Sequence, residues 1–105
     1  MQIVTTNKIK GKEITETLGL VKGSTIRSKD IARDIMAGLK TIIGGEVKVY
    51  TKAIEEARQE AMDRMIKEAE NMGANAIVGL RFATSQVMPG AAEILAYGTA
   101  VKIGE

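Results

Sequence analysis

Two β-rich runs near the C-terminus place the strongest constraint on the fold of this chain. Residues 75–87 and 92–103 are rich in β-branched and other apolar residues, and Met88-Pro89-Gly90 between them favours a tight turn. The two runs therefore predict a β-hairpin. A sheet with one face in water alternates apolar and polar residues, whereas these runs carry apolar or small residues on both faces. We therefore expect both faces to be covered.

A long helix is predicted over residues 52–72, where apolar or small residues recur every three or four positions. This stripe consists of Ile54, Ala57, Ala61, Met65, Ala69 and Met72. Thr51 is a candidate N-cap, and Gly73 is a candidate C-cap because glycine enters the left-handed conformation without strain. The alanines predict that the helix approaches its neighbour closely.

The remaining elements are shorter or less regular. Residues 1–6 predict a short strand, and residues 13–27 predict a long strand that is bent by bulges at its glycines, Gly19 and Gly23. A second helical stripe predicts a helix over residues 30–43, ended by Gly44-Gly45 and followed by a short link over residues 46–50. The stripe is formed by Ile31, Ile35, Leu39 and Ile42. The expected order is β-β-α-α-β-β in a single domain over residues 1–105.

The turn sets an expected register for the hairpin. With Met88 opposite Ala91, Phe82 pairs with Tyr97 on a face of large side chains, and we expect the long helix to cover this face. The opposite face carries mostly small side chains. It is formed by Ile77, Gly79, Arg81, Ala83, Ile94, Ala96, Gly98 and Ala100. Either the shorter helix or a second copy of the chain would cover the small face, and the second possibility predicts a homo-oligomer.

Composition excludes several kinds of chemistry. The chain has no cysteine and no histidine, so thiolate nucleophiles, imidazole-based catalytic triads and the common zinc motifs are absent. Its net charge of +2 and three aromatic residues do not resemble a nucleic-acid-binding surface. No apolar run is long enough to span a membrane. We expect a cytoplasmic protein with no cofactor, no nucleic-acid partner and no membrane partner.

Charged residues on the predicted strands are the candidate ligand-binding residues: Arg81 on the small face, Glu16 among apolar strand positions, Glu93 in mid-strand, and Arg27 at the end of the long strand. A charge on a covered face needs a partner. Either Arg81 pairs with a carboxylate at a subunit boundary, or the boundary holds an anion or other ligand. The candidate interface residues are Gly79, Ala83, Ile94, Ala96, Gly98 and Ala100. No catalytic or metal-binding residue is predicted.

Two other groups of residues leave alternatives open. Lys8, Lys10 and Lys12 predict a solvated loop or lysine-protected edge strand, with anion binding as the alternative. The methionines predict core packing, with a soft-metal site as the alternative.

Several segments, taken together and in order, resemble the YbjQ-like family over essentially the whole chain. The segments are Val4-Thr5-Thr6, Thr25-Ile26-Arg27-Ser28, Gly44-Gly45-Glu46, Glu55-Glu56-Ala57-Arg58, Gly73-Ala74-Asn75-Ala76-Ile77-Val78-Gly79 and Tyr97-Gly98-Thr99-Ala100-Val101. The resemblance implies an α+β fold like that of a dodecin subunit, with an antiparallel sheet against a long helix, assembled as a homopentamer. The family is named for heavy-metal binding and has no established activity.

Three functional classes follow from these observations. The leading expectation is a non-enzymatic, oligomeric protein that could hold a ligand between its subunits. The alternative is a small-molecule-binding or metal-binding protein, by analogy with the flavin-holding dodecins. An enzyme using Glu, Lys or Tyr is the third class, but the sequence brings no such set of groups together.

Overall fold

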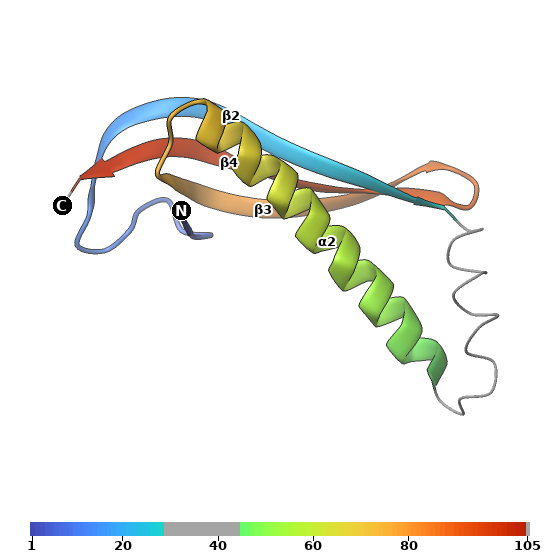
Figure 1. Ribbon diagram of the computed structural model, residues 1–105. Helices are drawn as coiled ribbons and strands as arrows, with labels where there is room; N and C mark the ends of the chain where they lie inside the picture. The colour runs from blue at the N-terminus through green and yellow to red at the C-terminus, as the bar shows by residue number, and fades with distance from the viewer. Residues whose placement is uncertain (29–44, 105) are drawn as a thin grey trace.

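The protein has an α+β fold in which one helix packs on a four-stranded mixed sheet (Figure 1). The computed structural model describes residues 1–28 and 45–104. Its elements are β1 (Gln2–Ile3), β2 (Glu13–Ser28), α2 (Gly45–Asn71), β3 (Ala76–Met88) and β4 (Ala91–Gly104). The strand order in the sheet is β1-β3-β4-β2. The helix expected over residues 30–43 lies outside the described residues.

The sheet is mixed rather than wholly antiparallel, which corrects the expectation from sequence. β4 pairs antiparallel with both β2 and β3, whereas β1 runs parallel to β3. The first strand is also shorter than expected, because only Gln2 and Ile3 form ladder pairs. The chain then continues along β3 without regular pairing, and Val4 accepts a backbone hydrogen bond from Leu80. Most of the N-terminal segment is therefore a loop.

The predicted hairpin is confirmed, but its register is not the predicted one. Met88 pairs with Ala91 at the turn as expected. β3 then carries one extra residue between Gln86 and Met88 and another between Val78 and Arg81, so that Arg81 pairs with Tyr97. The predicted pair of Phe82 with Tyr97 is therefore wrong. The predicted register requires a ladder without bulges between β3 and β4. Each bulge in β3 shifts the pairing by one residue.

The bulges also correct the predicted faces of the sheet. α2 packs on the face of small side chains, against Ala96 and Ala100, and not on the face of Tyr97. Phe82 pairs with Ala96 and so lies on the helix side, whereas Tyr97 lies on the other side. Small side chains on both partners allow a shorter distance between helix and sheet than the expected packing of small against large.

Gly23 of β2 marks the closest approach of the helix to the sheet. A Cβ atom at this position would collide with the backbone of Ala61 and Met65. Ala57, Ala61, Met65 and Ala69 of α2 have no exposed surface, which confirms the central four positions of the predicted stripe, whereas its two end positions, Ile54 and Met72, are exposed. Gly23 pairs with Ala96 in an unbroken ladder, so the bulge expected at Gly23 is wrong, whereas Gly19 has a φ of 130° beside a register shift.

The helix begins earlier than the sequence pattern indicated. α2 starts at Gly45, so that the expected link over residues 46–50 and the N-cap at Thr51 are wrong. Its C-terminus agrees with the prediction. Gly73 has a φ of 86°, and the amides of Gly73 and Ala74 donate to the carbonyls of Glu70 and Ala69. These paired bonds form the Schellman motif, which requires a left-handed residue after the helix.

The face opposite α2 is covered only in part. Ile9 of the N-terminal loop is buried against Ala76, Val78 and Val101. Further along the same face, toward the β3–β4 turn, Leu20 and Ile26 are exposed. Within the described residues, the face opposite α2 is therefore covered where the N-terminal loop lies and exposed toward the β3–β4 turn. The expectation that both faces are covered is met only in part. None of the helical segments described is both long and apolar enough to cross a membrane.

We expect Gly23→Ala to destabilise the protein by about 1–3 kcal/mol, because the added methyl group overfills the contact with the α2 backbone. Urea unfolding measures this loss. Gly11→Ala is the comparison for strain without collision: its Cβ has open space, and its φ of 81° costs about 1–2 kcal/mol of backbone strain. Equal stability of Gly23→Ala and wild type would contradict the close approach.

Candidate functional site

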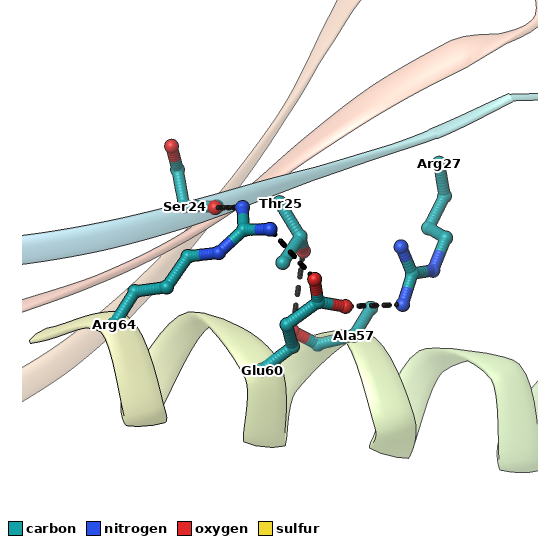
Figure 2. A network of polar contacts seen from close by, with 6 residues as sticks. All are labelled: Ser24, Thr25, Arg27, Ala57, Glu60 and Arg64. Atoms are coloured by element: carbon teal, nitrogen blue, oxygen red, sulfur yellow. Dashed lines mark hydrogen bonds and ion pairs between the residues drawn. The ribbon is translucent and has the colours of Figure 1, made fainter.

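A polar network joins α2 to β2 beside the close contact at Gly23 (Figure 2). The carboxylate of Glu60 accepts hydrogen bonds from Arg27 at 2.9 Å and from Arg64 at 2.7 Å. Arg64 also donates to the backbone carbonyl of Ser24, and the buried hydroxyl of Thr25 donates to the carbonyl of Ala57 at 3.1 Å. These bonds fix how the helix crosses β2.

The same contacts explain the one pKa shift in this network. The pKa of Glu60 lies below its ordinary value of 4.5, chiefly because Arg27 hydrogen-bonds the ionised carboxylate. Desolvation acts in the opposite direction, and the charges of Arg64 and Arg27 add to the lowering. Glu60 therefore stays ionised at neutral pH and acts as a structural anion, not as a proton donor.

The four candidate ligand-binding residues do not meet within one chain. Arg27 belongs to the network with Glu60, and Glu16 lies 3.8 Å from the Lys102 ammonium group. Arg81 donates to the carbonyl oxygens of Thr5 at 2.8 Å and of Leu80. Arg81 therefore holds the N-terminal loop against β3, an interaction that the sequence pattern did not indicate.

Glu93, the fourth candidate, pairs in register with Ile26 of β2 and Ser85 of β3. It lies on the face of the sheet away from α2, whereas Arg27 lies on the helix side. Two neighbouring positions in sequence, Ile26 and Arg27, thus point to opposite faces. Strand alternation by itself puts Ile26 and Arg27 on opposite faces, but which residue of β4 lies beside each depends on the register between the two strands.

The six candidate interface residues occupy different environments. Ile94, Ala96, Gly98 and Ala100 are buried within the chain on the α2 side of the sheet. Gly79 is half-buried, and Ala83 is exposed. A second copy cannot reach the four buried residues while α2 remains in place. Self-association stays a prediction, but its surface cannot include these four residues.

The lysine segment forms a loop and not an edge strand. A turn closes with the Lys12 amide donating to the Ile9 carbonyl, and Gly11 takes a positive φ of 81° within it. The loop borders a hollow of about 410 Å³ lined by residues 8–14. Ile9 is the buried anchor, whereas Lys8, Lys10 and Lys12 are exposed. The arrangement agrees with the prediction of a solvated loop. Among the residues that line the hollow, no polar side chain is buried, so the structure gives no support to the alternative of anion binding.

The most unusual surface lies on β3. Residues 81–88, here called the bare segment, are all exposed, although they form a regular strand paired with β4. The segment includes three large apolar side chains, Phe82, Val87 and Met88, which are 43%, 50% and 60% exposed. Neither face of this segment is buried, so its apolar atoms remain in water in a single chain.

A second exposed region lies on the sheet face away from α2. Leu20 and Ile26 of β2 are 65% and 59% exposed there. Tyr97 of β4 is half-buried on this face, at a position between those of Leu20 and Ile26. Its register partners are Lys22 of β2 and Arg81 of β3. We call this region the open face. It places two cations beside one tyrosine, a combination suited to an anionic group.

Comparison with known proteins identifies relatives of the same length. The chain is 60% identical over 103 residues to a UPF0145 protein of Methanosarcina acetivorans. The aligned region covers 98% of this chain and 97% of the relative. It is also 60% identical to a UPF0145 protein of Photobacterium profundum, over 98% of this chain and all of the relative. A family model described as "putative heavy-metal-binding" matches residues 1–104.

The chain belongs to the YbjQ family. A crystal structure of a protein of unknown function from Pediococcus pentosaceus, assigned to the DUF74 family, shares its fold with a TM-score of 0.61. Sequence identity to that protein is 18%, and the match covers 99% of this chain and 98% of the other. The resemblance stated from the sequence segments is thus confirmed at the level of the family.

The heavy metal in the family's description does not fit the residues of this chain. Soft metal ions prefer thiolate, thioether and imidazole ligands, and the sequence has neither cysteine nor histidine. Among residues 1–28 and 45–104, no three acidic side chains gather into a group that could hold an ion. The methionines of α2 include Met65, which is fully buried in the core between α2 and the sheet, as the prediction of core packing requires.

We expect Glu60→Gln to reduce stability at pH 7, because it removes the anion that both arginines bind. A carboxylate whose pKa is lowered by folding stabilises the fold above its unfolded pKa, and this contribution disappears as pH falls. The difference in urea midpoint between wild type and Glu60→Gln should therefore shrink below pH 4.5. Glu68→Gln, at an exposed position on α2, is the control. A difference that does not change with pH would contradict this role.

Proposed function

We propose that this chain is the subunit of a non-enzymatic, cytoplasmic homo-oligomer that holds a ligand where copies meet. The bare segment carries the proposal. A strand that exposes Phe82, Val87 and Met88 without cover on either face promotes association with other chains. Burial of these side chains by further copies would stabilise each subunit, at about 25 cal/mol for each Å² of apolar surface removed from water.

The extended form of the single chain also supports this proposal. Its radius of gyration is 16.9 Å, and its principal extents are 53 × 27 × 19 Å. A compact domain of roughly 100 residues has a radius of gyration of about 13 Å. An extended subunit leaves apolar surface uncovered, which is the expected condition of a chain that completes its core by assembly. Five copies is the number that the family resemblance implies.

A non-enzymatic role is supported by the separation of the candidate groups. Arg27, Glu16, Arg81 and Glu93 lie apart within the chain, and the first three contact other protein groups. Acid–base or nucleophilic catalysis needs its groups within hydrogen-bonding reach of one substrate.

Small-molecule binding is the second candidate, and the open face favours it. If Tyr97 were buried beneath α2, as the predicted register required, it could not stack on a ligand. In the structure it lies on the opposite face between Lys22 and Arg81. An anionic group on a flat apolar or aromatic body would suit these three residues. A boundary between copies would supply the enclosure that the open face lacks.

Native mass spectrometry at micromolar concentration tests both candidates in one measurement. We expect a multiple of the 11.3 kDa subunit mass, with five copies as the leading assignment. A retained mass that is lost in Lys22→Ala and Tyr97→Ala but kept in Glu68→Ala would support the ligand site. Only the mass of a single, ligand-free chain would contradict the proposed function.

A further inference from the structure

The outer edge of the bare segment is available for strand pairing. β1 pairs with β3 only at Ala76 and Ile77, and the N-terminal loop follows the same edge by backbone hydrogen bonds as far as Leu80. Beyond Leu80, no strand among the described residues pairs with this edge. Within residues 1–28 and 45–104, the edge therefore loses its backbone partner at the position where both faces of the strand become exposed.

The opposite edge of the sheet is formed by β2, whose only strand neighbour in the described part of the chain is β4. α2 lies mainly over β2, contacts β4 less and barely touches β3. Its N-terminal part also extends beyond the sheet (Figure 1). The helix is therefore displaced toward the β2 edge, and α2 does not extend over the bare segment at the other edge.

Two exposed apolar side chains fit this displacement. Ile54 continues the buried stripe of α2 toward the N-terminus, three residues before Ala57, yet it is 41% exposed. Phe82 lies on the α2 side of the bare segment and is 43% exposed. Among the described elements, no strand lies beneath Ile54 and no helix covers Phe82. A second copy placed beside the first at the β2 edge would supply each with the missing partner.

Strand direction permits this arrangement to repeat. β2 and β3 both run antiparallel to β4, so they run in the same direction within one sheet. Copies related by rotation about a common axis would therefore bring β3 of one alongside β2 of the next as a parallel pair. Such a head-to-tail contact uses two different surfaces, and it forms a closed ring when the rotation closes.

We infer that the bare segment of one copy adds as a strand to the outer edge of β2 in the next copy, beneath the projecting part of α2. This inference rests on the proposed function, because it assigns the contact that builds the homo-oligomer. Main-chain hydrogen bonds along the two edges supply affinity, as in other cases of strand addition. Phe82 packing against Ile54 supplies the apolar cover, with Arg27 and Glu60 at its polar rim.

Disulfide trapping tests the contact, since the natural sequence contains no cysteine that could interfere. Ser85→Cys is combined in turn with Lys22→Cys, Ser24→Cys or Ile26→Cys, which allows for different registers between the two edges. All four positions lie on the open-face side of the sheet. Within one chain β4 separates β2 from β3 by two strand spacings, about 10 Å, whereas a disulfide needs Cα atoms within about 7 Å. Any disulfide must therefore join two copies.

After mild oxidation, we expect at least one double variant to give a ladder of covalent multimers on a denaturing gel. Each single variant should remain monomeric there, because a head-to-tail contact brings two different positions together. Mixing Ser85→Cys with the productive β2 single variant should give covalent dimers and nothing larger. Ser85→Cys with Glu68→Cys is the matched control and should give no ladder.

Failure of this inference can be distinguished from failure of the proposed function. If native mass spectrometry shows an oligomer but no double variant forms a ladder, the contact is wrong and the proposed function stands. Dimers formed by a single variant would indicate like-to-like edges and would also overturn the contact. If native mass spectrometry shows only single chains, the proposed function is overturned, and the inference with it.

Discussion

The contact between the α2 backbone and Gly23 of β2 is the interaction on which the rest of the structure depends. Helix and strand meet there without intervening side chains, and the alanines of α2 extend the contact along the small-residue face of the sheet. Close packing of this kind leaves little freedom for the helix to shift. Glu60 then fixes its crossing of β2 through two arginines. The surfaces left exposed follow from where this contact holds the helix.

A helix held close to β2 cannot also cover β3, because one helix is narrower than a four-stranded sheet. The chain compensates at one end only, where the N-terminal loop and Ile9 cover part of the face away from α2. The bare segment and the open face remain without cover in a single chain. The exposed apolar side chains and the extended shape of the chain therefore have the same cause, which is the position of α2 over β2.

Membership of the YbjQ family establishes relatedness but assigns no chemistry to particular residues. The polar groups of this chain are mostly engaged in holding the fold: Arg27 and Arg64 bind Glu60, and Arg81 secures the N-terminal loop. Lys22 and Tyr97 lie together on the surface. In the described residues, the exposed apolar surfaces are clear structural features, whereas no group of acidic side chains could hold a metal ion.

The sequence by itself determined the long β2 strand, the C-terminal hairpin, the alanine stripe of α2 and its end at Gly73, because local periodicity and glycine conformation encode them. It did not determine which face the stripe covers. Two bulges in β3 reverse the faces of residues 81–86, and bulge positions depend on pairing between distant strands. α2 packs on the small-residue face of β4, which leaves Tyr97 on the opposite face, and the reversal in β3 moves Arg81 onto the face of Tyr97. Tertiary structure alone decided these surfaces, since each depends on contacts between segments far apart in the sequence.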